Sequence, residues 1–396
     1  MKKLALVLVV LLFASVASAQ VISNPTTNAR MDGLGVENWQ IEDDFNIWIN
    51  PAQITNYKSG IYGELGSFTN DDGGITANNV NQDNNITDQW GGIHMEMAGV
   101  WGIYLGRPYS GPLSLMDDPL NDEDINAPDT NRLDLFYAPT GMPFGGYLSY
   151  ANRSEENSTT DNATDINVGV GGLLMDGMLD VALNVDLPPS AENDKSGTKA
   201  ESDAGANFAL IARYHQSHEG GKYLYTAQIA TLDASITNDP DFGDVDNTGF
   251  FWRLDATCNS NPNDDTMLVL GIGIQGSTQT IDFKDSDEEI NVDTLAIPVN
   301  LAVEHQTFKK VKTRLGLSKA IYTSTDVSND EDFNTVNTPF DVGGATTASM
   351  GLGWMVHDNL SLDAVINQDV LFTGTYAVSG VPETLSSKIS ATYRFQ

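Results

Sequence analysis

The sequence predicts an all-β protein: a transmembrane antiparallel β-barrel of about 16 strands, or about 14 if two N-terminal strands merge. Three observations lead to this prediction. Apolar and polar side chains alternate with a period of two, the apolar face of each segment is long enough to cross a bilayer, and short and long connections alternate along the chain. We expect residues 59–396 to form the barrel.

The alternation is clearest in residues 294–306, and it recurs in 179–186, 250–256, 268–275 and 348–356. In the first of these, one face consists of Leu295, Ile297, Val299, Leu301 and Val303. A period of two is typical of a strand, and an apolar face of about nine to eleven residues spans a bilayer at the usual tilt. The opposite faces carry Gly, Ser, Thr, Asn and isolated charges, unlike the core of a soluble sandwich. A barrel that turns its apolar face to lipid fits this pattern, because only closed barrels or helices satisfy every backbone group there.

The connections between these segments alternate strictly between short turns and long acidic loops. Outer-membrane barrels have short periplasmic turns and longer extracellular loops, so this pattern is an independent indication. The predicted long loops are 152–165, 188–203, 238–247, 284–291 and 325–344. The alternation also requires a tight hairpin at Ala98 and Gly99. Counted in this way, the strands start near Gly60 and end at Phe395, which leaves both ends of the barrel in the periplasm.

The N-terminus predicts export. Lys2 and Lys3 precede an apolar run, and Ala17, Ser18 and Ala19 form a small-residue cleavage site. This order is typical of a signal peptide, here residues 1–19, and the apolar run is too short for a retained transmembrane helix. We therefore expect the mature chain to reside in the outer membrane of a Gram-negative cell.

Composition excludes several classes of protein. With 54 acidic and 20 basic residues, the formal net charge is -34. Such a chain repels nucleic acid, so we expect no nucleic-acid partner. A single Cys258 excludes an internal disulfide framework and a cysteine-based zinc site. Its parity with Phe250 and Trp252 predicts a small lipid-facing residue.

The last ten residues, SKISATYRFQ, alternate up to a penultimate aromatic residue. This stretch resembles the C-terminal insertion signal of outer-membrane proteins, in which a terminal aromatic residue ends the last strand. The resemblance implies that Tyr393 and Phe395 are recognised by the barrel assembly machinery. The sequence departs from that pattern at Gln396, which follows the aromatic residue.

Residues 28–54, NARMDGLGVENWQIEDDFNIWINPAQI, precede the first strand. They resemble the pre-barrel segment of the FadL-type superfamily of outer-membrane transporters, which includes the PorV-like proteins. The match lies in the Ala-Arg pair, the glycines, the acidic pair and the step Asn50-Pro51-Ala52, whereas Gln53 stands where relatives tend to have glycine. The resemblance implies that residues 20–58 plug the lumen and that the barrel transports small or hydrophobic molecules. The alternative for Trp48 is an anchor in the periplasmic aromatic girdle.

Strand parity predicts which charged side chains face the lumen. The candidates are Arg213, Arg253, Asp255, Glu304, Lys312, Arg314 and Asp363, together with Asp180, Asp186, Lys388 and Arg394. Opposed acidic and basic rows in a pore orient polar solutes by a transverse field. The alternative is that these charges pair with each other and hold the barrel or the plug.

The acidic loops raise the question of calcium, whose ligands are carboxylate and carbonyl oxygens. The candidate ligands are Asp239, Asp241, Asp244 and Asp246, and a second acidic run covers 117–129. Neither run has the spacing of an EF-hand. A solvated outer surface is the alternative, and we predict no other cofactor.

Three classes of function remain. The sequence favours an outer-membrane channel or transporter for passive uptake, with lipid and small-molecule solutes as partners. The alternative is a non-conducting structural or surface-interaction barrel. A barrel enzyme is the third, but no serine elbow is present, and His215 and His218 point to opposite faces of a strand. We therefore expect no enzymatic activity; the oligomeric state stays open.

Overall fold

The computed structural model describes most of the chain after residue 28. The described residues are 29–65, 89–107, 132–156, 160–188, 190–195, 198–203, 205–239, 243–284, 288–329, 338–339, 346–366 and 386–395. Residues 1–28, and with them the predicted signal peptide, lie outside this set, as do the acidic run 117–129 and Asp241.

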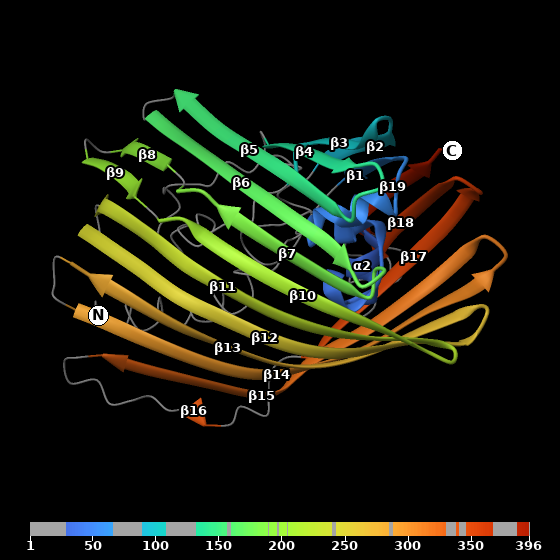
Figure 1. The fold of residues 1–396 in the computed structure, drawn as a ribbon. Coiled ribbons are helices and arrows are strands. Elements are labelled where there is room, and N and C mark those ends of the chain that lie inside the picture. The colour runs from blue at the N-terminus through green and yellow to red at the C-terminus, as the bar shows by residue number, and fades with distance from the viewer. Residues whose placement is uncertain are drawn as a thin grey trace, which may run out of the picture.

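One antiparallel sheet of nineteen strands contains nearly all of the described chain. Setting aside β8, β9 and β16, sixteen strands follow one another around a ring, each antiparallel to the next. They are β1 (Gly60–Leu65), β2 (Trp90–Glu96), β3 (Gly99–Leu105), β4 (Arg132–Pro139), β5 (Phe144–Glu156), β6 (Thr160–Leu174), β7 (Leu179–Asp186), β10 (Asn207–His218), β11 (Gly221–Asp239), β12 (Gly243–Asn263), β13 (Thr266–Phe283), β14 (Glu288–Phe308), β15 (Val311–Asn329), β17 (Thr347–His357), β18 (Leu360–Ile366) and β19 (Ser386–Arg394). The last strand pairs with the first, Arg394 opposite Gly60, and closes the barrel (Figure 1). The predicted count of sixteen is confirmed.

The hairpin predicted at Ala98 and Gly99 is confirmed as the turn between β2 and β3. Gly99 has a φ of +152°, and a Cβ atom there would lie 2.7 Å from the Tyr137 ring and 2.8 Å from the carbonyl oxygen of Ala138. Only glycine fits such a position. The short turns of the described chain, such as those between β10 and β11 and between β14 and β15, lie at one end of the barrel, where β1 starts and β19 ends.

Several of the predicted long loops are wrong in extent, because strands continue into them. β5 and β6 stay paired through Glu156 and Thr160, and β12 begins at Gly243, inside the predicted loop 238–247. Within the predicted loop 188–203, β8 (Ser190–Lys195) and β9 (Thr198–Asp203) pair with each other, and they also pair with β6 and β11. A short strand, β16 (Thr338–Pro339), pairs with β15. Beyond the apolar region the outward-facing side chains become polar, but the backbone hydrogen bonds of the ladder continue.

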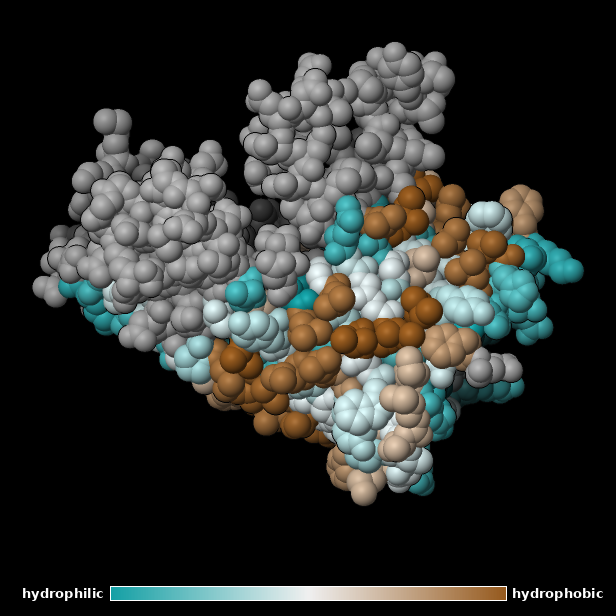
Figure 2. Space-filling view, turned by 90° about the horizontal axis from the view of Figure 1, so that it is seen from above, coloured by the Kyte–Doolittle hydropathy of each residue, from teal (hydrophilic) through white to brown (hydrophobic). Residues whose placement is uncertain are grey.

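The outer surface carries a belt of apolar side chains. Leu254, Leu270 and Leu301 are about half exposed. Their strand neighbours Val269 and Ala302 are buried on the opposite face. Figure 2 shows one side of this belt, with brown apolar side chains across the middle of the strands and teal polar side chains toward the ends. The apolar face of the strands therefore points outward, whereas in a soluble sandwich it points into the core. The alternation predicts this arrangement.

The described residues before the barrel, 29–59, form four short helices. They are α2 (Ala29–Leu34), η1 (Asn38–Gln40), η2 (Asp44–Trp48) and η3 (Pro51–Thr55), and the last three are 3-10 helices. Among the described residues, no helix is long and apolar enough to cross a membrane.

These helices lie against strands on opposite sides of the ring. Helix α2 contacts β14, β15, β17, β18 and β19, whereas η3 contacts β4, β5 and β6. Figure 1 shows the same arrangement, with the blue helices within the ring of strands. We call residues 29–58 the N-terminal segment. It occupies the part of the barrel interior near the short turns.

Trp48 shows how this segment is packed. It is 2% exposed, and its ring contacts those of Tyr104 and Phe136 at centroid distances of 5.1 and 4.7 Å. Edge-to-face contacts of this kind are typical of aromatic cores. The alternative prediction, that Trp48 anchors at the membrane interface, is wrong, because its ring is enclosed by inward-facing side chains.

Candidate functional site: the barrel interior and its N-terminal segment

The step Asn50-Pro51-Ala52 begins helix η3. Asn50 is the N-cap: its Oδ1 accepts from the amide of Ala52 at 3.0 Å, and its Nδ2 donates to the carbonyl oxygen of Gly172 at 3.1 Å. Pro51 fits the first helical position, since its φ is already helical and its missing amide hydrogen is not needed there. One asparagine thus starts the helix and also attaches it to β6. Pro51 is the first residue of this helix.

Wall glycines allow this step to lie directly on the strands. A Cβ atom on Gly145 of β5 would lie 2.7 Å from the carbonyl oxygen of Pro51 and 2.9 Å from the Cα of Ala52. Gly33 of α2 and Gly351 of β17 make a similar contact, in which an added Cβ would lie 2.8 Å from the opposite Cα. The backbone of the segment therefore contacts the backbone of the wall on two sides of the barrel.

Gln53 gives the segment a further polar contact. Its Nε2 donates to Oδ2 of Asp180 on β7 at 2.7 Å, and both side chains are buried. The departure from the family pattern at this position therefore supplies a hydrogen bond that glycine could not make.

Asp180 also belongs to a buried charge pair. Its Oδ2 accepts from Nη2 of Arg213 on β10 at 2.6 Å, and Arg213 is 1% exposed. Nη1 of Arg213 donates to Oδ1 of Asn46 in the segment at 3.0 Å. His215 lies beside this pair, with Nε2 3.0 Å from the same Asp180 oxygen. The pair thus holds the segment through Asn46 as well as holding two strands together.

Three consecutive acidic residues point in three directions, two of them toward the wall and one toward α2 within the segment. Glu42 contacts Nδ1 of His215 at 2.8 Å, and its other oxygen accepts from Lys222 of β11. Asp43 pairs with Arg30 of α2. Asp44 accepts from Nη2 of Arg394 on β19 at 2.7 Å. We call Glu42, Asp43 and Asp44 the acidic triplet.

Arg30 connects the triplet to a network in the wall. Its Nε donates to Oε2 of Glu304 on β14 at 3.1 Å. The same carboxylate accepts from Nε of Arg314 at 2.7 Å and from Lys312 at 2.9 Å. Arg314 also pairs with Asp363 of β18. Glu304 is therefore the shared acceptor of three cations, one from the segment and two from β15.

Two further cations of the wall lie against the segment. The Arg253 guanidinium lies 4.5 Å from the centroid of the Trp39 ring and pairs with Asp255. Nζ of Lys388 on β19 lies 2.9 Å from Oδ2 of Asp32 in α2. Both arrangements neutralise or cover a buried charge, which is costly to leave unpaired.

The acidic triplet shows opposite shifts of pKa. The hydrogen bond with His215 lowers the pKa of Glu42 to about 2, helped by Lys222 and opposed by burial. Burial and the neighbouring charge of Asp43 raise the pKa of Asp44 to about 8, despite Arg394. Asp43 and Asp44 thus favour a state in which they share one proton, because two carboxylates at close range repel each other.

The structure brings the predicted lumen residues together in pairs. Arg213, Arg253, Asp255, Glu304, Arg314 and Asp363 are buried, and Lys312 reaches Glu304 from the end of its strand. Asp186 accepts a hydrogen bond from Asn167. Sequence parity missed the partners inside the N-terminal segment, chiefly Arg30 and Glu42. In the sequence, Arg30 stands out only as part of the Ala-Arg pair of the resemblance, and Glu42 only by its position directly before the acidic pair.

Two other groups of predicted residues lie apart from this region. Asp246 pairs with Lys284 at 3.0 Å, Asp244 is half-buried, and the described residues contain no group of three side chains that could hold a metal ion. Asp239 ends β11. The ring of Tyr393 is exposed on the outer surface and stacks on Phe395 at 6.3 Å.

Cys258 of β12 is half-buried, and its Sγ lies 3.9 Å from Nε2 of His218. The thiol shares its strand parity with Phe250, which is exposed on the outer surface.

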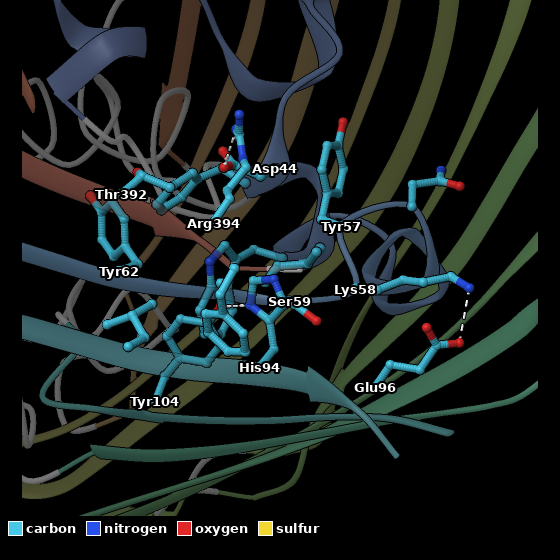
Figure 3. Close-up of a pocket in the computed structure, with 17 residues that line it drawn as sticks. Asp44, Tyr57, Lys58, Ser59, Tyr62, His94, Glu96, Tyr104, Thr392 and Arg394 are labelled. Atoms are coloured by element: carbon cyan, nitrogen blue, oxygen red, sulfur yellow. Dashed lines mark hydrogen bonds and ion pairs between the residues drawn. The ribbon is translucent and has the colours of Figure 1, made fainter. Parts of the chain in front are cut away.

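A pocket remains between the N-terminal segment and β1, β2 and β19, at the end of the barrel that carries the short turns. Its volume is about 560 Å³. Figure 3 shows the Asp44–Arg394 pair on one side of it and the Lys58–Glu96 pair on another. The segment therefore leaves a space along this part of the wall.

The opposite end of the strands carries an apolar patch on the inner face. It consists of Ile281, Phe283, Ile290 and Val292, with Val245 and Val327 packed against them. These residues lie near the ends of β12–β15 that are remote from the short turns. The interior is thus apolar near one end, whereas near the other end its charged side chains form ion pairs.

The fold and the outward apolar belt define an outer-membrane β-barrel protein. No protein-family model and no curated protein matches the chain. Similar solved structures include a FadL homologue of Pseudomonas aeruginosa, with a TM-score of 0.41 and 13% identity over 94% of this chain and 99% of that one. They also include the monoaromatic hydrocarbon channel CymD, with a TM-score of 0.39 and 10% identity over 93% and 97%.

Larger ferric receptors are similar over only part of their length. The ferric citrate transporter FecA has a TM-score of 0.41 and 9% identity, over 78% of this chain. The chain spans 44% of the length of FecA and 40% of the length of FpvA of Pseudomonas aeruginosa, whose structure was solved with bound pyoverdine.

Proposed function

We propose that this protein is an outer-membrane transporter for passive uptake of small or hydrophobic molecules, and that its N-terminal segment plugs the lumen. One observation carries the proposal: the segment lies inside a closed barrel and is bonded to strands all around it. Its attachments are Asn50 to β6, Gln53 to β7, Glu42 to β10 and β11, Arg30 to β14, and Asp44 to β19.

The short turns then face the periplasm, and the inner apolar patch near Phe283 faces the cell exterior. A hydrophobic solute that enters from outside first meets this patch, which favours its transfer out of water. It next reaches the N-terminal segment, so passage requires the segment to move. The lumen charges pair with one another and with the segment. This favours a role in holding the plug rather than a transverse field that orients polar solutes.

The second candidate is a non-conducting structural barrel. The close backbone contacts of Gly145 and Gly351 with the segment favour it, because they leave no space for a solute on those sides. We also propose that Tyr393 and Phe395 contact the assembly machinery during insertion. The proposal assigns the chain no catalytic activity.

The two candidates differ in conductance. The mature chain and a variant without residues 21–56 are reconstituted in planar bilayers, and folding is checked by the heat-dependent shift of the barrel on gels. The transporter proposal expects a low current from the complete chain and a large, stable current after the deletion. No current from either folded protein would contradict it.

Uptake is then measured directly by swelling of proteoliposomes in arabinose and by accumulation of radiolabelled toluene. Faster toluene accumulation than in protein-free vesicles supports transport of hydrophobic molecules. Swelling alone would restrict the proposal to polar solutes.

A further inference from the structure

The pocket beside the N-terminal segment has the size and lining of a ligand site. A volume of about 560 Å³ falls within the usual range for pockets that take a small organic molecule. The rings of Trp48, Tyr62 and Tyr104 line it, and each is at most 5% exposed. Phe45 and Tyr62 contact each other with ring centroids 4.4 Å apart. The inner wall is therefore a packed aromatic cluster that holds its shape.

The charged pairs of the pocket are Asp44–Arg394 and Lys58–Glu96, and in both the cation is more exposed than its partner. The Arg394 side chain is 63% exposed and that of Asp44 is 12% exposed. The corresponding fractions are 52% for Lys58 and 40% for Glu96. An incoming anion can thus reach a guanidinium and an ammonium that project into solvent, whereas an incoming cation meets carboxylates that are better covered.

The bond geometry of Arg394 leaves room for such an anion. A guanidinium has five N–H donors and binds carboxylates with two parallel hydrogen bonds. Asp44 accepts from Nη2 alone at 2.7 Å. Since burial and Asp43 raise the pKa of Asp44 to about 8, this carboxyl group is partly protonated near neutral pH and neutralises Arg394 incompletely. Figure 3 shows Arg394 between Asp44 and Thr392, beside the open part of the pocket.

We propose that this pocket binds a small amphipathic organic anion from the periplasmic side, with its carboxylate on Arg394 and its apolar body against the aromatic wall. The site is distinct from the lumen near Phe283, because the aromatic cluster and the N-terminal segment lie between them. This proposal rests on the proposed function only for the statement that the short-turn end faces the periplasm. Its test measures binding and not transport.

The experiment is calorimetric titration of the complete mature protein in detergent with 2-naphthoate. Two matched probes separate body from head group: 2-naphthalenemethanol lacks the charge, and acetate lacks the body. We expect 2-naphthoate to bind at least about tenfold more tightly than either. Equal binding of 2-naphthoate and its neutral analogue would contradict the proposal, since partition into detergent would produce it.

Two variants with opposite expected effects test the role of the guanidinium. R394Q weakens 2-naphthoate binding about tenfold or more, because a charged, two-point contact is lost. D44N strengthens it several-fold, because the competing carboxylate is removed. K284Q, which alters a cation near the remote end of β13, leaves it unchanged. Unchanged affinity in both R394Q and D44N would overturn the assignment.

Arg394 belongs to the last strand, so R394Q could fail to assemble. S59W is the second variant: Ser59 lines the pocket directly before β1, and an indole there fills part of the space. The proposal expects S59W to abolish 2-naphthoate binding while the barrel stays folded. Binding at the wild-type affinity in folded S59W would place the ligand elsewhere.

Discussion

Replacing Gly145 by alanine places a methyl group against the Asn50-Pro51-Ala52 step. The new Cβ would lie 2.7 Å from the carbonyl oxygen of Pro51 and 2.9 Å from both the Cα and the amide nitrogen of Ala52. Ordinary contact begins at 3.4 Å, so the segment must move by 3.4 − 2.7 Å, which is 0.7 Å, or the strand must yield. The three contacts are with backbone atoms, which cannot turn aside as a flexible side chain can.

Overpacking of this kind costs about 1–3 kcal/mol. Because about 1.4 kcal/mol corresponds to a factor of ten in an equilibrium, the displaced state of the segment becomes about 5 to 150 times more populated. The assay is single-channel recording in planar bilayers, scored as the fraction of time in a conducting state. We expect this fraction to rise in G145A by a factor within that range.

The matched control is G63A, a glycine-to-alanine change in β1. A Cβ atom on Gly63 meets nothing within 4 Å, so this variant shares the effect of alanine on the backbone but does not push on the segment. If the open fraction of G145A equals those of G63A and the wild type, the segment does not control conductance and the reasoning fails.

Three further predictions concern the attachment of the segment. E304Q removes the shared acceptor of Arg30, Lys312 and Arg314, and we expect it to lower the free energy of unfolding in urea by about 3–5 kcal/mol. E96Q, at the exposed pair with Lys58, should cost less than about 1 kcal/mol, and equal losses would contradict the importance of burial. W48A should cost about 3–5 kcal/mol, whereas W101A on the outer surface should cost much less in detergent; the same urea titration decides this. Attachment of the segment, followed by protease cleavage within residues 29–58, should be strongest near pH 4 to 4.5. Below this range Glu42, whose pKa falls from 4.5 to about 2 on folding, loses its stabilising contacts. Above it the attachment should weaken as the pH rises to about 8 and then stay constant, because burial and Asp43 raise the pKa of Asp44 from 3.8 to about 8, so that only the attached state retains this proton. E42Q should remove the acid limb and D44N the alkaline limb, and cleavage that is independent of pH would contradict both assignments.

The period of two was sufficient to predict the barrel. In β13 and β14, Leu270 and Leu301 face outward and Val269 and Ala302 inward because the pleat of a strand alternates strictly. The turn at Gly99 followed from the alternation of short and long connections. The extent of β12 and β13 did not, because beyond the apolar belt their outward-facing side chains are polar and no longer delimit a lipid-facing strand.

The contacts of the N-terminal segment could not be predicted from the sequence. Arg30 and Glu304 are 274 positions apart, and no local pattern relates them. Helices η2 and η3 are single short turns without periodicity, so the directions of Glu42, Asp43 and Asp44 depend on the 3-10 geometry and on the wall around it. The Asn-Pro-Ala step was recognisable, but its support by Gly145 and Gly172 depends on how β5 and β6 fold beneath it.

The central claim is that the N-terminal segment closes the lumen, and a reversible tether tests it most directly. In a C258S background, Gln53 and Asp180, whose side chains are 2.7 Å apart, are both replaced by cysteine and joined by a short cleavable thiol reagent. Current is recorded at pH 9, where ionised Asp44 weakens the attachment, before tethering, after it, and after cleavage of the reagent. The account predicts that the tether abolishes the current and that cleavage restores it. A current that is the same in all three states would show that solutes pass without movement of the segment.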